Sequence, residues 1–133
     1  MSLTPDITTE PIPVGIQRSR IKKQVSPNGL PIKYVGRPSK WGNPFRVIQK
    51  DGYWFVISDI SGPEFSSKDK NEAINFSLGN YGEYISHEHN AGNLNICELI
   101  DKNLSCWCRL DCKCHRDILL NVAKQLKIKR NDL

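Results

Sequence analysis

The stretch that decides the fold is NLSCWCRLDCKCHRDILLNVAKQLKIK, residues 103–129. Its first part, residues 103–108, is typical of a buried β-strand, and residues 115–129 are typical of an amphipathic helix with a basic C-terminal end. The loop between them carries the chain from the end of a strand to the beginning of a helix. Ligands of α/β proteins usually bind at such a junction, so this stretch predicts a ligand site.

Four cysteines and one histidine lie within this segment. Thiolates and imidazole are ligands that zinc prefers, and four of them are enough for a structural site. The spacing is Cys-X-Cys twice, whereas zinc fingers carry Cys-X-X-Cys pairs, and the adjacent Cys114 and His115 would be strained in ligating one ion together. Zinc is therefore one hypothesis, with four candidate ligands: Cys106, Cys108, Cys114 and His115.

The same segment supports a second interpretation. Cys114 and His115 would lie in the field of the helix N-terminus, which lowers the pKa of a thiol and attracts anions. Asp117 would then be a helix cap, a ribose-hydroxyl acceptor or a general base, so Cys114, His115 and Asp117 are candidate catalytic residues. In a third interpretation the thiols are simply buried and Asp117 caps the helix. The residues alone leave all three open.

A second unusual stretch is GRPSKWGNPF, residues 36–45. Its glycines permit close backbone approach and its prolines stiffen the loop. The cations suit phosphate, the indole suits stacking on a base, and the amide can donate and accept hydrogen bonds at once. The alternative is an ordered turn with the tryptophan in the core. The candidate ligand-binding residues are Arg37, Ser39, Lys40, Trp41, Asn43 and, from the first stretch, Arg116.

Charge is unevenly distributed along the 133 residues. The net charge is +5, from 19 Lys and Arg against 14 Asp and Glu, and no carboxylate occurs between Glu10 and Asp51. That window holds nine basic residues: Arg18, Arg20, Lys22, Lys23, Lys33, Arg37, Lys40, Arg46 and Lys50. Segregation of this kind favours an anionic partner such as a nucleotide or nucleic acid, although a solvated basic face is the alternative.

The order of elements predicts a small single-domain α/β fold, with a mixed sheet that includes a β-hairpin and two main helices packed on it. The hairpin turn is expected at Asp51-Gly52, and the first helix is expected to begin after an N-cap at Ser66 or Ser67. We expect residues 1–13 to form a flexible arm, residues 14–128 the single domain, and residues 129–133 a basic tail.

Composition argues against a membrane partner and a secretory leader. No run approaches the roughly 18 apolar residues of a membrane helix, and the N-terminus lacks the basic and apolar regions of a signal peptide. Five cysteines are an odd number, which suggests reactive or metal-binding thiols in a reducing compartment rather than a disulfide framework. A cytoplasmic location is therefore expected.

Together the two motifs resemble a family of bacterial and bacteriophage domains of unknown function with the pattern GRPSKWGNPF … L-x-CWC … CHGDVLLEL. The resemblance runs from about Ile16 to Leu126. It implies a single-domain intracellular protein, often phage-encoded and then in the host cytoplasm, but it supplies no reaction. The chain departs from the pattern at Arg116, which replaces a glycine, and at Cys112, which is extra.

Two functions follow as hypotheses. In the first, the two motifs meet at one sheet edge and bind a phosphate-containing nucleotide, nucleoside or nucleic-acid ligand, with an enzyme of nucleotide processing as one form. In the second, the protein is a non-catalytic, zinc-stabilised nucleic-acid-binding module or an inhibitor of a host nucleic-acid enzyme. The sequence determines neither the reaction nor the oligomeric state.

Overall fold

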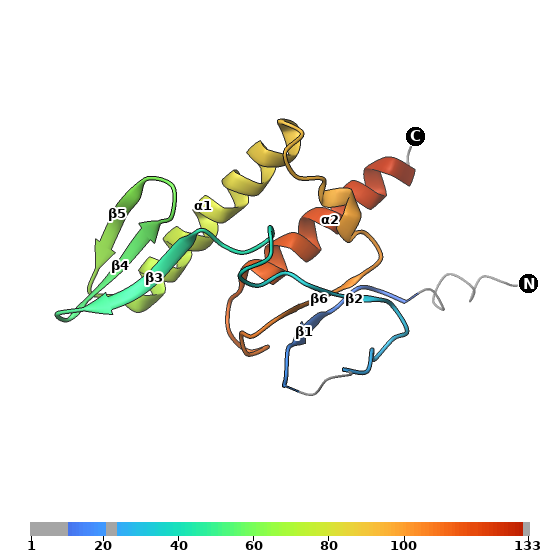
Figure 1. Ribbon diagram of the computed structural model, residues 1–133, viewed down its shortest axis with the longest axis horizontal. Coiled ribbons are helices and arrows are strands. Elements are labelled where there is room, and N and C mark those ends of the chain that lie inside the picture. Colours follow the sequence, from blue (N-terminus) through green and yellow to red (C-terminus); the bar gives the residue numbers. More distant parts are fainter. Residues whose placement is uncertain (1–10, 21–23, 132–133) are drawn as a thin grey trace, which may run out of the picture.

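The computed structural model describes residues 11–20 and 24–131. Three short strands form a parallel sheet in the order β1 (Gly15–Gln17), β6 (Asn103–Cys106) and β2 (Ile32–Tyr34) (Figure 1). All four residues of β6 are buried, as expected for the central strand of a parallel sheet. Because the strands are parallel, their carboxyl ends lie at the same edge.

The other three strands form an antiparallel sheet in the order β3 (Phe45–Lys50), β4 (Tyr53–Ser58) and β5 (Gly62–Ser67). The turn between β3 and β4 consists of Asp51 and Gly52, whose φ angles are 53° and 80°. Positive φ at both positions is what a tight two-residue hairpin turn requires. The predicted hairpin is therefore confirmed.

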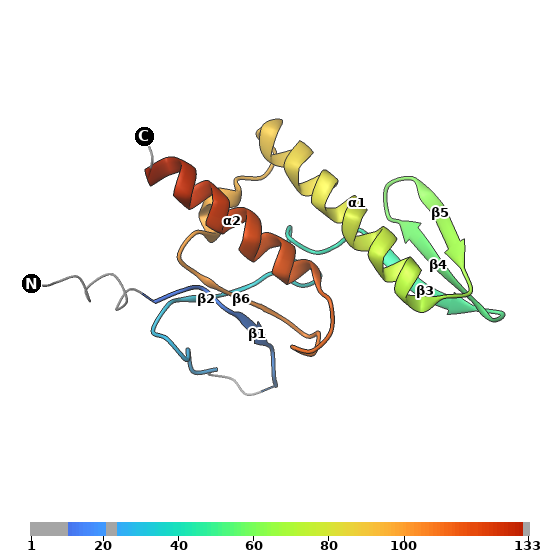
Figure 2. The same ribbon diagram turned by 180° about the vertical axis from the view of Figure 1, so that it is seen from behind.

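Helix α1 (Lys70–Asn90) packs against the antiparallel sheet (Figures 1 and 2). Its N-cap is Asp69, whose side chain accepts a hydrogen bond from the Asn71 backbone, so the expected cap at Ser66 or Ser67 was wrong. Asp69 is preferred because its carboxylate also suits the positive end of the helix. The buried residues recur every four positions and define one face: Ala73, Ser77, Tyr81 and Ile85.

Helix α2 (His115–Asn131) follows the loop after β6 and packs against the parallel sheet (Figure 2). A short 3-10 helix, η2 (Ile96–Leu99), precedes β6 and packs on α2. The strand–loop–helix order predicted for residues 103–129 is confirmed. Because α2 continues to Asn131, residues 129–131 belong to the helix, although we expected a tail there. Residues 1–10 of the expected arm and 132–133 of the tail lie outside the described residues.

The hydrophobic core joins the parallel sheet to both helices. Trp41, from the loop between β2 and β3, is fully buried in it. The other buried members are Val35, Tyr81, Ile85, Leu94, Ile96, Leu99, Ile100, Leu104, Leu119 and Ala123. Truncation of a buried tryptophan to alanine typically lowers the free energy of unfolding by about 3–5 kcal/mol. Because the fold depends this strongly on the buried indole, Trp41 determines the path of the loop.

The structure confirms a single-domain α/β fold with two main helices. The strands divide between two sheets instead of joining one mixed sheet. The loop of residues 36–44 explains the division, because it turns the chain away from the parallel sheet and buries Trp41 before β3 begins. Among the described residues, no helix is both long and apolar enough to cross a bilayer.

Candidate metal and ligand site

A cleft of about 500 Å³ opens at the carboxyl edge of the parallel sheet. One wall consists of the end of β6 and the loop that leads to α2, and the opposite wall consists of β3 and α1. Arg37 lies in the cleft with Cys106 and His115, although the three residues are far apart in the sequence. The two motifs therefore meet at one sheet edge, as the sequence predicted.

Three buried side chains in this wall bring metal-ligand atoms together. One ligand atom from each of Cys106, Cys114 and His115 lies within 4.8 Å of the other two. The sulfur of Cys108, which is exposed, lies 3.8 Å from the sulfur of Cys106. Cys106, Cys114 and His115 form a cluster that could hold a metal ion. Cys108, the fourth ligand that the sequence proposed, lies beside Cys106 but is not part of this group of three.

Two distances in the cluster match the edges of a tetrahedral zinc site. Two thiolates about 2.3 Å from a tetrahedral zinc lie roughly 3.8 Å apart, and a thiolate and an imidazole nitrogen lie roughly 3.6 Å apart. The Cys106–Cys108 sulfur distance is 3.8 Å, and the Cys114 sulfur lies 3.5 Å from Nδ1 of His115. These two distances are compatible with zinc, and the ligand atoms of Cys114 and His115 both reach the cluster although the two residues are adjacent in the sequence.

The tautomer of His115 is set by a contact with the parallel sheet. Its Nε2 lies 2.7 Å from the carbonyl oxygen of Val35, so Nε2 carries the proton and donates. Nδ1 then has a free lone pair directed toward the Cys114 sulfur. Burial lowers the pKa of His115, which favours the neutral ring that a metal requires.

The three thiols affect one another. Hydrogen bonding with Cys108, and then with Cys114, holds the pKa of Cys106 far below the ordinary value of a thiol. The same hydrogen bonds with Cys106 raise the pKa of Cys108 and of Cys114. One thiolate thus forms readily in the cluster, and a cation favours ionisation of the other two.

Arg116 is fully buried, so its predicted role as a grip for a ligand anion was wrong. Its guanidinium donates to the carbonyl oxygens of Ile16 at 3.3 Å, Cys108 at 3.2 Å and Arg109 at 3.4 Å. It packs so tightly over Gly15 that a Cβ there would lie 2.9 Å from Nε of Arg116. Through these hydrogen bonds the Arg116 side chain connects the loop that carries Cys108 to β1.

Asp117 does not join the other two predicted catalytic residues. Its side chain is exposed, lies 3.6 Å from Nε of Arg116, and lines a different cavity of about 510 Å³ beside residues 11–13. The ring nitrogens of His115 face Val35 and Cys114 instead. A catalytic set of Cys114, His115 and Asp117 is therefore not assembled, because α2 directs the carboxylate away from the cleft.

Arg37 and Asn43 line the cleft but also hold their own loop together. Nε of Arg37 donates to the carbonyl oxygen of Asn43 at 2.8 Å, and burial is the main cause that lowers the pKa of Arg37. The Asn43 amide donates to Ser77 at 3.0 Å and accepts from the backbone of Phe45 at 2.9 Å. Arg37 keeps an exposed surface for a ligand, whereas the Asn43 amide is already engaged.

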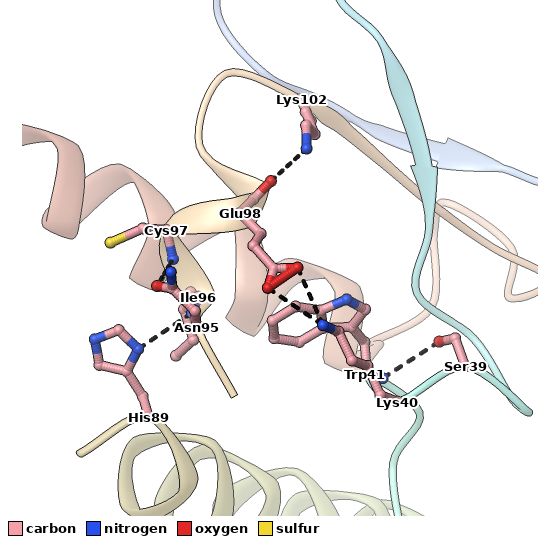
Figure 3. Close-up of polar contacts among 9 residues, drawn as sticks. All are labelled: Ser39, Lys40, Trp41, His89, Asn95, Ile96, Cys97, Glu98 and Lys102. Atoms are coloured by element: carbon pink, nitrogen blue, oxygen red, sulfur yellow. Dashed lines mark hydrogen bonds and ion pairs between the residues drawn. The ribbon is translucent and has the colours of Figure 1, made fainter. Parts of the chain in front are cut away.

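The remaining predicted ligand-binding residues of this loop, Ser39, Lys40 and Trp41, are not among the residues that line the cleft. Figure 3 shows their contacts with one another and with η2. Trp41 is fully buried, so its predicted stacking on a ligand was wrong. Lys40 forms an ion pair with Glu98 at 3.0 Å, and Ser39 accepts a hydrogen bond from the Trp41 backbone at 3.3 Å. The ion pair connects the loop to η2, and the hydrogen bond stabilises the loop itself. The loop is therefore the ordered turn with a core indole that the sequence offered as the alternative.

The cleft is positively charged. Three cationic side chains line it, those of Arg37, Arg46 and Lys113, and none of its described lining residues is Asp or Glu. Arg46 is paired with Asp59 at 2.9 Å, and Lys113 donates to the side chain of Asn75 at 2.9 Å. Since Asp59 offsets only Arg46, the remaining cations of this concave wall still favour an anionic ligand.

Three residues at the mouth of the cleft were missed as site residues. Arg18 follows β1, Tyr34 ends β2 and Trp107 follows β6. The Arg18 guanidinium carbon lies 4.7 Å from the centre of the Tyr34 ring and 5.8 Å from that of Trp107. The three residues have in common that each lies at the carboxyl end of a strand. The sequence does not show that these strands are parallel neighbours, so it could not show that the residues lie together.

Comparison with known proteins places the chain in a family without assigning it an activity. Residues 16–125 match the model of a family described as a domain of unknown function, DUF4326. Neither the curated proteins nor the solved structures contain a match. Since the matched region spans most of the 133 residues, the chain belongs to the DUF4326 family.

Proposed function

We propose that the protein binds one zinc ion through Cys106, Cys108, Cys114 and His115, and that the cleft beside this ion binds the phosphate part of a nucleotide or nucleic-acid ligand. The carrying observation is that four zinc donors, with two tetrahedral-edge distances, share a cleft with three cations. On this proposal the protein is a binding module, and the metal ion has a structural role in stabilising the site.

Zinc suits the donor set better than other common metals. Three thiolates and one imidazole are soft and borderline ligands, whereas magnesium and calcium take oxygen ligands. Four protein donors also complete a tetrahedral shell, which is the pattern of structural zinc. The ion would fix the loop between β6 and α2, whose exposed residues 107–113 contribute no residue to the hydrophobic core. A reducing compartment such as the cytoplasm keeps the thiols available.

The ligand is proposed from size and charge. A cleft of about 500 Å³ is much larger than a single phosphate and falls within the range of small-molecule sites, about 300–1,000 Å³. Arg37 and Lys113 supply guanidinium and ammonium donors for phosphate oxygens. The site also lies at the carboxyl edge of a parallel sheet, where α/β proteins bind phosphorylated ligands.

Binding is favoured over catalysis by the residues that face the ligand. General acid–base chemistry needs a titratable group within reach of the ligand. The described lining residues include no carboxylate, and on this proposal the thiols and His115 are occupied by the ion. The Tyr34 hydroxyl donates to the carbonyl oxygen of Arg37, and the Lys113 ammonium is assigned to phosphate. Asp117, the predicted base, lines another cavity.

Metal content and ligand titration test the proposal together. We expect about one zinc per purified chain, lost in Cys106→Ser and His115→Gln but kept in Cys112→Ser, because Cys112 lies in the same loop outside the donor set.

We expect ADP and a labelled oligothymidine to bind in a salt-dependent way. Arg37→Gln and Lys113→Gln should each weaken binding about tenfold, while Lys40→Gln should not. Zinc-free protein, or equal binding by all three cation variants, would contradict the proposal.

A further inference from the structure

A stack of three side chains lies beside the cleft, with Arg18 and Trp107 exposed and Tyr34 half-buried. Trp107 is 51% exposed, which is unusual for so large an apolar side chain. The guanidinium of Arg18, also exposed, lies near the rings of both Tyr34 and Trp107. Because each residue comes from a different strand end, three separate parts of the chain place this stack at one point.

The stack is continuous with the cleft. Tyr34 and Trp107 line the cleft together with Arg37 and Lys113. Tyr34 is held in position because its hydroxyl donates to the carbonyl oxygen of Arg37. Trp107 is the residue between the metal donors Cys106 and Cys108, so a bound ion would fix its backbone on both sides. The aromatic surface is therefore attached to the two most constrained parts of the site.

The chemistry of the stack selects one kind of ligand group. An indole face and a planar guanidinium both stack on flat aromatic rings, and the surrounding cations attract phosphate. A purely apolar partner would be a poor match, because the exposed neighbours of Trp107 include Arg18 and Arg109. A nucleobase joined to a phosphate satisfies both requirements, since every base offers an aromatic face beside an anion.

From this geometry, and resting on the proposed phosphate site, we infer that Trp107 and Arg18 bind an unpaired nucleobase by stacking, while Arg37 and Lys113 hold the phosphate next to it. Trp107, rather than the buried Trp41, supplies the aromatic surface. Duplex nucleic acid is excluded as the preferred ligand, because its bases are already stacked and paired. A free nucleotide and a single strand share the required chemistry.

The test compares ligands that differ only in the base. The probes are AMP, oligothymidine of about ten nucleotides, an abasic strand of the same length, and the matching duplex. Wild-type protein should bind oligothymidine at least about tenfold more tightly than the abasic strand and the duplex. Comparable affinities for AMP and oligothymidine would identify a free nucleotide as the source, and much tighter strand binding would identify a strand.

The variants separate this inference from the phosphate site. Trp107→Ala should weaken oligothymidine about tenfold and leave the abasic strand unchanged, while Trp107→Phe should retain most of the affinity. Trp54→Phe, on β4 outside the cleft, is the matched control. Zinc content checks the fold of each variant. Arg18→Gln repeats the test at a residue that is far from the metal donors in the sequence and whose backbone contact with Cys106 the substitution leaves in place.

The outcomes are distinct. If Trp107→Ala and Arg18→Gln leave the preference for oligothymidine over the abasic strand unchanged, the base site is refuted, while an effect of Arg37→Gln on both strands still supports the phosphate site. If wild-type protein shows no preference for bases, the inference fails in the same way. If Arg37→Gln affects neither strand, the proposed function fails as well.

Discussion

Nε2 of His115 lies 2.7 Å from the carbonyl oxygen of Val35, which joins the first residue of α2 to the residue that follows β2. This single contact sets the proton on one ring nitrogen and leaves the other directed at Cys114. A hydrogen bond from the ring nitrogen that does not bind the metal orients a histidine ligand, and its loss commonly costs about 10–100-fold in metal affinity. The parallel sheet therefore prepares a donor for the metal.

Removal of the metal should destabilise the protein. A strong chelator is expected to lower the melting temperature of the wild type by at least about 10 °C, because the ion connects β6 to α2 and its binding free energy is part of the folding free energy. The measurement is a thermal melt with and without chelator. Cys106→Ser should melt near the chelated wild type and show no further effect of chelator, whereas Cys112→Ser should behave as wild type.

Substitutions of Arg116 and Gly15 should have coupled effects on the free energy of unfolding. Arg116→Met leaves three carbonyl oxygens without their donor and is expected to cost about 3 kcal/mol of unfolding free energy. Gly15→Ala should cost about 1–3 kcal/mol, because the new Cβ would meet Nε of Arg116 at 2.9 Å.

A double-mutant cycle by chemical denaturation measures the coupling. The cost of Gly15→Ala should fall in the Arg116→Met background, because the opposing guanidinium is gone. Gly79→Ala is the control, since a Cβ at this helical position meets nothing within 4 Å and should stabilise slightly. Strict additivity of the two changes would show that Arg116 does not press on Gly15.

Trp41 should matter for stability and not for ligand affinity. Trp41→Ala removes a fully buried indole and is expected to cost about 3–5 kcal/mol. Lys40→Ala should cost less than about 1 kcal/mol, because its ion pair with Glu98 is half exposed. Denaturation curves give the stabilities, and titration of the folded fraction gives the affinity. A Trp41→Phe variant that folds fully yet loses ligand would contradict the core role.

Tyr81 should make the protein sensitive to alkali. Its hydroxyl donates to the Trp41 carbonyl oxygen at 2.6 Å, and burial raises its pKa well above 10. In the unfolded chain the phenol loses its proton near pH 10, while in the folded protein it keeps it. The contribution to stability is therefore present below about pH 10 and decreases as the pH rises further.

The check is the unfolding free energy of wild type and Tyr81→Phe between neutral pH and about pH 11. The variant is expected to be less stable at neutral pH, because the carbonyl of Trp41 loses its donor, but to decline less above pH 10. Parallel curves for the two proteins would show that Tyr81 does not cause the alkaline loss.

Local patterns in the sequence predicted the fold well, because they depend on neighbours along the chain. The strand before Cys106, the helix after Cys114 and the Asp51-Gly52 turn are of this kind. The fold brings three of the four proposed metal ligands together, Cys106, Cys114 and His115, with Cys108 beside Cys106. Residues at one strand–helix junction are close in the chain, so their proximity could be predicted from the sequence.

Burial was harder to predict, because it depends on contacts between distant segments. Nothing near Trp41 in the chain shows that it enters the core, and nothing near Trp107 shows that it stays exposed. Arg116 is buried because Gly15, about a hundred residues earlier, leaves room for it. The sequence therefore indicated which residue types lie at this edge of the sheet, but not that Trp41 is buried and Trp107 exposed.

X-ray absorption at the zinc edge of the purified protein tests the central claim most directly. We predict one zinc per chain with three sulfur neighbours at about 2.3 Å and one nitrogen neighbour at about 2.0 Å. In Cys108→Ser one sulfur should be replaced by an oxygen or nitrogen neighbour, and in Cys112→Ser the spectrum should not change. A zinc shell of oxygen and nitrogen alone, or protein that holds no zinc when prepared under reducing conditions, would contradict the account.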